Sequence, residues 1–108
     1  MSIILFYVPC DNENAARTMA YDLIKKKLAI CANIIPNVVS IYPWNEKIAE
    51  EKEVILVLKT HNSCKKNCKN RIAKLHPYDT PAIISIATSN VNKKFLKWSS
   101  SLLFPDIK

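Results

Sequence analysis

"LAICANIIPNVVSIYPWNEKIAEEKEVILVLKT", residues Leu28 to Thr60, contains two apolar runs separated by a polar stretch. The first run is apolar apart from Asn33 until Pro36-Asn37 interrupts it, and it then resumes. It therefore predicts either one bent strand or two strand pieces, Leu28–Ile35 and Val38–Trp44.

The second run is Glu53–Lys59, which reads Val-Ile-Leu-Val-Leu between its charged ends and predicts another strand. The polar segment Asn45–Glu51 lies between the two runs and predicts a turn. Two strands joined by a turn of this length can pair antiparallel, so the middle of the chain is predicted to be a β-hairpin.

Outside the hairpin, strands and helices are predicted to alternate. An apolar run that ends at Pro9 predicts a strand, and apolar residues at helical spacing follow Asp11 or Asn12, either of which can cap a helix. Asn62 or Ser63 can cap a second helix in the same way. The predicted elements are strand Ile3–Val8, a helix to about Lys27, the hairpin, a helix to Leu75, strand Ala82–Thr88 and helix Val91–Leu103, whose apolar stripe is Phe95, Trp98 and Leu102.

The order βαββαβ plus a helix is the ferredoxin-like α+β plan, with an antiparallel sheet and an extra C-terminal helix. At 108 residues we expect one domain, residues 1–108, with one modest core. Two helices cover only one face of the sheet, yet the strands are apolar on both faces. We therefore expect neighbouring subunits or the third helix to cover the other face.

Composition limits the compartment and the partners. No stretch approaches the roughly 20 apolar residues of a membrane-spanning helix, and no secretory leader is visible, so we expect a soluble cytoplasmic protein with no membrane partner. The four cysteines are then expected to be free thiols.

A net charge of +7 suggests a nucleic-acid partner, but the bias toward Lys, Ile and Asn with no Gly is typical of an AT-rich coding sequence. We regard a nucleic-acid partner as unlikely.

The lack of glycine also limits the turns. Positive backbone φ angles must then be adopted by other residue types, among which asparagine is the most tolerant. Asn37 and Asn45 are the predicted positions.

Four motifs in this order resemble the CutA divalent-ion (copper) tolerance family over almost the whole chain. They are Cys-x-Asn-x-x-Pro from Cys31, Ser-x-Tyr-x-Trp from Ser40, Glu-x-x-x-x-Leu-Lys-Thr from Glu53 and His-Pro-Tyr from His76. The resemblance implies a homotrimer of ferredoxin-like subunits, similar in plan to the PII signalling proteins, that takes part in divalent-cation tolerance. It implies that copper, another divalent ion or a small ligand binds in clefts between subunits. It implies no enzymatic activity and no obligatory cofactor.

The resemblance also implies positions for these sites. It places Tyr42, Trp44, Lys59 and Tyr78 at the ligand cleft, and His76 and Cys31 as possible metal ligands. The chain departs from the family where Ala82 follows Pro81 in place of a common glutamate. It also carries Tyr7 and Leu75 where some relatives offer copper a cysteine and a second histidine.

The residues themselves suggest other sites. His61, Cys64 and Cys68 are spaced to share one helical face and could hold copper(I) or zinc, although Cys68 continues into the stripe Ile72 and Leu75, which favours core packing. For His76, a role as a ligand and a role as a turn residue alone are equal alternatives. A hard cation would be expected at the acidic cluster of Glu46, Glu50, Glu51 and Glu53. Cys31 and His76 lack a third orienting group, and a chain without glycine has no phosphate loop, so catalysis is not expected.

Alternatively, the chain is a PII-like sensor or scaffold that binds a protein or a metabolite at the cleft around Tyr42, Lys59 and Tyr78.

Overall fold

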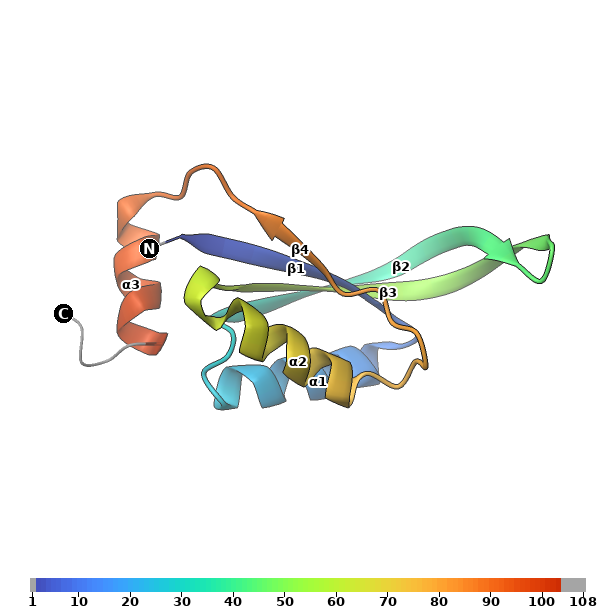
Figure 1. Cartoon of the computed structure of the whole chain (residues 1–108), viewed down its shortest axis with the longest axis horizontal. Helices are drawn as coiled ribbons and strands as arrows, with labels where there is room; N and C mark the ends of the chain where they lie inside the picture. Colours follow the sequence, from blue (N-terminus) through green and yellow to red (C-terminus); the bar gives the residue numbers. More distant parts are fainter. Residues whose placement is uncertain (1, 104–108) are drawn as a thin grey trace.

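A long β-hairpin dominates the computed structural model, which describes residues 2–103 (Figure 1). Strands β2 (Cys31–Trp44) and β3 (Lys47–His61) pair antiparallel up to the contact of Trp44 with Lys47. Only Asn45 and Glu46 turn the chain, with φ angles of 48° and 63°. Two successive positive φ angles are typical of the type I′ turn that suits the twist of a hairpin. The predicted polar turn over residues 45–51 is therefore too long, because its last five residues continue the strand.

The first hairpin strand is bent rather than divided. Ile35 lies opposite Ile55 and Val38 opposite Glu53, so β2 carries one extra residue at Pro36-Asn37. Proline has no backbone N–H and is tolerated where the ladder is interrupted by such a bulge. Asn37 has a φ angle of 59°, which confirms it, like Asn45, as a positive-φ position.

The sheet has the strand order β2-β3-β1-β4, and every neighbouring pair is antiparallel. This is the ferredoxin-like arrangement, so the predicted fold class is confirmed. Strand β1 (Ile3–Cys10) is central, and β4 (Ile84–Ala87) pairs only with the four residues Ile4 to Tyr7. Strand β4 is thus shorter than predicted.

Helices α1 (Glu13–Lys25) and α2 (Lys65–Leu75) lie side by side on one face of the sheet (Figure 1). Their apolar faces and the strands beneath them form the main core. Its buried residues are Ile4, Phe6, Val8, Cys10, Ala16, Met19, Ala20, Leu23, Ala29, Val54, Leu56, Leu58, Cys68 and Ile72. None of the described helices is long and apolar enough to cross a membrane.

Helix α1 is capped at both ends by local hydrogen bonds. The Asn12 side chain accepts from the amide of Ala15 (2.8 Å), so Asn12 rather than Asp11 is the cap. At the other end, the amide of Leu28 donates to the carbonyl of Leu23 (2.9 Å). Lys27, with a φ angle of 58°, adopts the left-handed conformation of a Schellman ending. The helix therefore ends at Lys25, slightly before the predicted boundary.

Helix α2 begins differently from its prediction. Residues Asn62–Cys64 form a 3₁₀ helix, η1, and within the described part of the chain no side chain caps η1 or α2. The prediction of an Asn62 or Ser63 cap is therefore wrong. The helix is instead tied to α1 by Arg71, which donates two hydrogen bonds to the Asp22 carboxylate (2.8 and 2.9 Å).

Helix α3 (Lys93–Leu103) lies across one end of the sheet (Figure 1). Its last residue, Leu103, packs with Ile3 and Ile30 in a second apolar cluster. Phe95 is partly buried there, but Trp98 and Leu102 remain 50% and 40% exposed. The predicted stripe is therefore only partly a packing face, and Ser99 and Leu103 are the residues that α3 buries.

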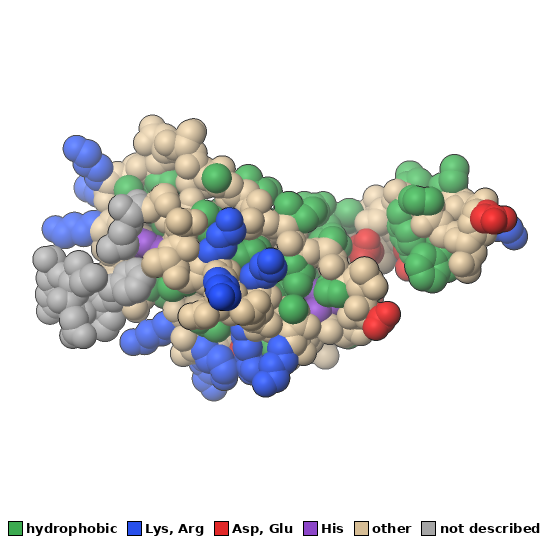
Figure 2. All heavy atoms as spheres, in the orientation of Figure 1, with side chains coloured by type: hydrophobic (Ala, Val, Ile, Leu, Met, Phe, Trp, Pro, Cys, Tyr) green, Lys and Arg blue, Asp and Glu red, His purple; other side chains and the backbone are tan. Residues whose placement is uncertain are grey.

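Among residues 2–103, only α3 covers the sheet face opposite α1 and α2, and it covers that face at one end, where Ile3 is buried. Tyr7, Ile84 and Ile86 on that face are 38%, 50% and 44% exposed. The outer part of the hairpin extends beyond the body as an arm, residues 38–53, and it too carries exposed apolar side chains, including Ile48 at 80% (Figure 2). The arm makes the chain 53 Å long, with a radius of gyration of 15.0 Å against about 13 Å for a compact chain of this size.

Candidate functional site

His76 is built into the turn that follows α2. Its side chain is buried, and its Nε2 atom donates to the carbonyl of Pro9 at the end of β1 (2.8 Å). Its Nδ1 atom accepts from the amide of Tyr78 (3.1 Å). This assigns the neutral tautomer with the proton on Nε2, and both ring nitrogens are then engaged. A metal ion could bind His76 only by displacing one of these bonds.

Tyr78 links the same turn to the root of the arm. Its hydroxyl donates to Oε2 of Glu53 (2.7 Å), and its ring packs edge-on against the His76 ring, with centroids 4.7 Å apart. Burial raises the pKa of Tyr78, and the hydrogen bond to the Glu53 carboxylate raises it further. The side chain is therefore a neutral donor. The sequence alone had placed Glu53 only in an acidic cluster, because nothing local signals a partner 25 residues away.

Cys31 and Lys59 lie directly opposite one another on β2 and β3. The Lys59 ammonium donates to Oδ1 of Asn33 (3.1 Å), the residue two positions after Cys31 on the same face of the sheet. Cys31 is half-buried with a free thiol. This group therefore offers one soft sulfur, one amide and one cation.

Tyr42 and Trp44 lie on one face of the arm. Their ring centroids are 6.4 Å apart in an edge-to-face contact, and Trp44 is 63% exposed. Desolvation raises the pKa of Tyr42, and the neighbouring Glu51 carboxylate adds to the effect. Two aromatic rings with a carboxylate beside them form a surface that can contact a second chain or a flat ligand.

The predicted ligand cleft does not come together within one subunit. Tyr42 lies opposite Ala49, which is ten residues from Lys59 along β3. At about 3.3 Å per residue the two sites are roughly 33 Å apart. Tyr78 lies at the root of the arm, between them.

The two predicted metal ligands, Cys31 and His76, also lie apart within one chain. Cys31 is in register with Lys59 and so with Leu5, near the start of β1, whereas His76 contacts Pro9 near its end. Four residues of strand and two strand spacings separate them, about 13 Å along β1 and about 10 Å across the sheet. One subunit alone does not place both groups on one ion.

The alternative metal site on the helix, made of His61, Cys64 and Cys68, consists of side chains that pack inside the fold. The Cys68 side chain is fully buried in the main core, where desolvation raises the pKa of its thiol to about 12. The His61 Nε2 atom lies 3.2 Å from the Ser99 hydroxyl, and Cys64 packs against the second apolar cluster. Within residues 2–103, no group of three or more His, Cys, Asp or Glu side chains could hold a metal ion.

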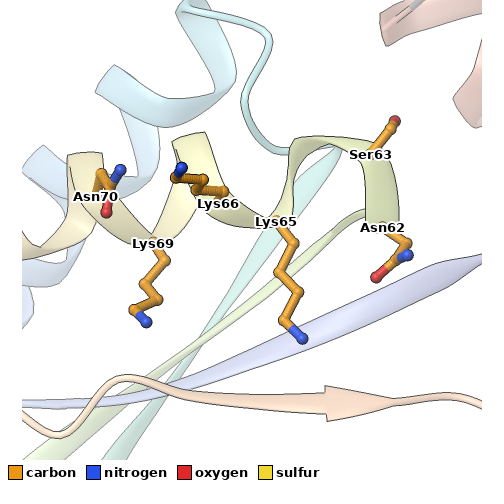
Figure 3. A pocket seen from close by; sticks show the side chains of 6 residues that line it. All are labelled: Asn62, Ser63, Lys65, Lys66, Lys69 and Asn70. Atoms are coloured by element: carbon orange, nitrogen blue, oxygen red, sulfur yellow. The ribbon is translucent and has the colours of Figure 1, made fainter.

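A hollow of about 550 Å³ lies beside α2, away from the predicted residues (Figure 3). Lys65 and Lys69 point in the same direction there, and no acidic side chain among residues 2–103 lines the hollow. The remaining lining residues are Asn62, Ser63, Lys66 and Asn70.

Known proteins resemble the chain in both sequence and structure. It is 36% identical over 96 residues to the divalent-cation tolerance protein CutA of Thermus thermophilus, covering 89% of this chain and 91% of that protein. It is 40% identical over 96 residues to the protein of the same name from Pyrococcus horikoshii, covering 89% and 93%. The crystal structure of the divalent ion tolerance protein CutA1 from Ehrlichia chaffeensis superposes with a TM-score of 0.92 at 37% identity, over 94% of this chain and 95% of that one.

The family profile described as CutA1 divalent ion tolerance protein matches residues 4–101. The match includes all four motifs and every strand and helix of the ferredoxin-like unit except the ends of β1 and α3. The chain belongs to the CutA1 divalent ion tolerance protein family.

Proposed function

We propose that this chain acts as a homotrimer in divalent-cation tolerance and binds copper, another divalent ion or a small ligand in clefts between its subunits. The observation that carries the proposal is the uncovered apolar surface of the isolated subunit. Tyr7, Ile84 and Ile86 on the sheet and Ile48 on the arm expose large apolar side chains that a partner surface would bury. Full burial of one such side chain contributes about 1.5–3 kcal/mol, so several of them together favour association.

Association also supplies what one subunit lacks. The cleft residues Tyr42, Lys59 and Tyr78 are spread along the hairpin, and an arm reaching a neighbouring sheet can bring an aromatic pair to another subunit's lysine. The 53 Å subunit is long enough for such a reach. In the proposed trimer each cleft combines residues from different chains.

For the metal, we propose Cys31 and His76 as donors from different subunits. A thiol and an imidazole suit copper(I) or zinc better than a hard cation. Cys31 is half-buried and carries a free thiol, whereas His76 must give up the Pro9 or the Tyr78 hydrogen bond. Cys31 is therefore the stronger candidate of the two. The set of His61, Cys64 and Cys68 is the weaker alternative because Cys68 lies in the core.

The second candidate function is a PII-like sensor or scaffold that binds a metabolite or a protein. The engagement of both His76 ring nitrogens within the subunit favours it. In either case we propose a binding protein, not an enzyme, that works in the cytoplasm with its four thiols reduced.

The test is a titration of the reduced, metal-free protein with copper(I) and with zinc against a competing chelator. We expect metal uptake with a fixed stoichiometry per trimer. The affinity for the metal should fall at least tenfold in Cys31→Ser and by a smaller factor in His76→Gln. Cys68→Ala is the matched control and retains uptake. Wild-type protein that takes up neither ion would overturn metal binding and favour the sensor. Loss of uptake in Cys68→Ala would move the site to α2.

A further inference from the structure

The hollow beside α2 is lined by side chains that can all donate hydrogen bonds. Lys65, Lys66 and Lys69 bring three ammonium groups to it, and Lys65 and Lys69 point the same way (Figure 3). The other donors are the amides and the hydroxyl of Asn62, Asn70 and Ser63. With no Asp or Glu from residues 2–103 in its lining, the hollow presents positive charge alone.

These three lysines form no ion pair within the described part of the chain. The ion pairs there join Glu13 to Arg17 and Asp22 to Lys26 and Arg71. Helix α2 itself contains neither Asp nor Glu. In the view of Figure 2, lysine and arginine side chains gather over the helices, while acidic ones lie mostly on the arm. The charge of the hollow is therefore not neutralised by any carboxylate of residues 2–103.

The lysines also repel one another and the start of their own helix. Lys65 and Lys66 are each about one turn from Lys69, a spacing at which like charges destabilise a helix. Lys65 and Lys66 lie in the first turn, where the helix dipole disfavours cations. Helix α1 has the usual order, with Glu13 in its first turn and Lys25 in its last. An anion bound in the hollow would offset both repulsions of α2.

The lysine-rich composition of the chain accounts for the charges but not for the polar hollow. Helix α3 begins with the same spacing of three lysines, at Lys93, Lys94 and Lys97. At the positions that match Ser63 and Asn70, however, the chain has Val91 and Trp98. The start of α3 thus repeats the charge of α2 with apolar and aromatic neighbours in place of small polar ones.

We propose that the hollow beside α2 is a binding site for a short chain of phosphate groups, such as inorganic triphosphate. Phosphate oxygens accept charge-assisted hydrogen bonds from lysine and from the amides at a helix start. Linked phosphates carry several negative charges, which match three lysines about one turn apart better than a single carboxylate does. No aromatic side chain among residues 2–103 lines the hollow to stack on a base. The lining therefore favours the phosphate chain itself over a nucleic acid.

This site is separate from the proposed metal and ligand cleft. It shares no side chain with Cys31, His76 or the cleft residues Tyr42, Lys59 and Tyr78. Helix α2 lies on one face of the sheet, and the face proposed to associate is the opposite one (Figure 1). The hollow should therefore remain open in an assembly, and phosphate binding can succeed or fail independently of metal uptake.

The test is isothermal titration calorimetry of the reduced full chain with sodium triphosphate at pH 7.5 and low salt. We expect one saturable site per chain, with an affinity that falls at least tenfold in Lys65→Gln/Lys69→Gln. The matched control is Lys93→Gln/Lys97→Gln, which removes the same charge from the same helical positions of α3 and should lose less than twofold. Added salt should weaken binding by the wild type, because exposed charges are screened.

Hydrogen exchange should place the ligand. The amides of η1 and of the first turn of α2 should gain protection with triphosphate, and those at the start of α3 should not. Glutamine has nearly the helix propensity of lysine, so both double variants should fold, with urea midpoints close to that of the wild type.

The absence of saturable binding by the wild type would overturn the site. So would an equal loss in both double variants, because net charge and not the hollow would then explain binding. Citrate bound as tightly as triphosphate would reject the assignment to phosphate. Tighter binding of a single-stranded oligonucleotide through Lys65 and Lys69 would also reject it, because the surface would then recognise a nucleic acid.

Discussion

At the residue scale, His76 connects three segments of backbone, and its removal should be costly. His76→Ala leaves the Pro9 carbonyl and the Tyr78 amide without their partner in a buried turn. Each unsatisfied buried group costs about 1–3 kcal/mol, so we expect a loss of about 2–4 kcal/mol in the free energy of unfolding, measured by urea denaturation. His76→Gln, which keeps a donor, should lose less. Equal stability of His76→Ala and wild type would show that the turn does not depend on these bonds.

A second residue-scale prediction concerns acid. The hydrogen bonds and charge of Arg71 hold the pKa of Asp22 at about 2, below its usual 3.8. Because the folded-state value is the lower one, the pair stabilises the fold above pH 3.8 and loses its effect as pH falls through about 2. Asp22→Asn should therefore be less stable than wild type in urea at pH 7, with a difference that shrinks toward pH 2. The control is Glu13→Gln, since the exposed Glu13–Arg17 pair should contribute little at either pH.

At the element scale, a chain without glycine should gain stability where glycine is supplied. Lys27 has a φ angle of 58° in the Schellman ending of α1. A left-handed conformation costs a non-glycine residue about 1–2 kcal/mol, and part of this is offset by the entropy that glycine loses on folding. We expect Lys27→Gly to raise the free energy of unfolding by about 0.5–1 kcal/mol. Lys25→Gly, at the last residue of α1, should lower it instead. A gain there as well would point away from the backbone angle.

Apolar periodicity and the absence of glycine together explain which parts of the fold could be predicted. The hairpin, the strand order and both covering helices follow from apolar periodicity, and Asn37 and Asn45 were predicted because asparagine tolerates positive φ. Glu46 and Lys27 have positive φ too, but the type I′ turn and the helix ending impose it, and nothing in those residue types signals it. The hydrogen bond from Tyr78 to Glu53 and the contact between His61 and Ser99 join residues far apart in sequence, so no local pattern could reveal them.

At the scale of the whole molecule, the spacing of the predicted site residues has a physical explanation. Motifs along one sequence predict that residues share a role, but not whether one subunit or several bring them together. Cys31 on β2 lies level with Leu5 near the start of β1, whereas His76 contacts Pro9 near its end. Lys59 and Tyr42 lie toward opposite ends of the hairpin. A site that uses them together requires an assembly, so oligomeric state and ligand binding should be lost together.

The decisive variant places charge on the uncovered sheet face. Ile84 and Ile86 are 50% and 44% exposed on β4, and glutamate at both positions would have to be buried in any assembly that covers this face. Wild type should have a mass near 37 kDa by light scattering, three times the 12.3 kDa chain, and Ile84→Glu/Ile86→Glu should shift it toward the monomer and lose metal uptake. Tyr21→Glu, at a 71% exposed position on the covered side, is the control and should remain trimeric. If wild type were monomeric and still bound metal, the whole site would lie within one chain. That result would contradict the proposal that Cys31 and His76 of different chains form the site.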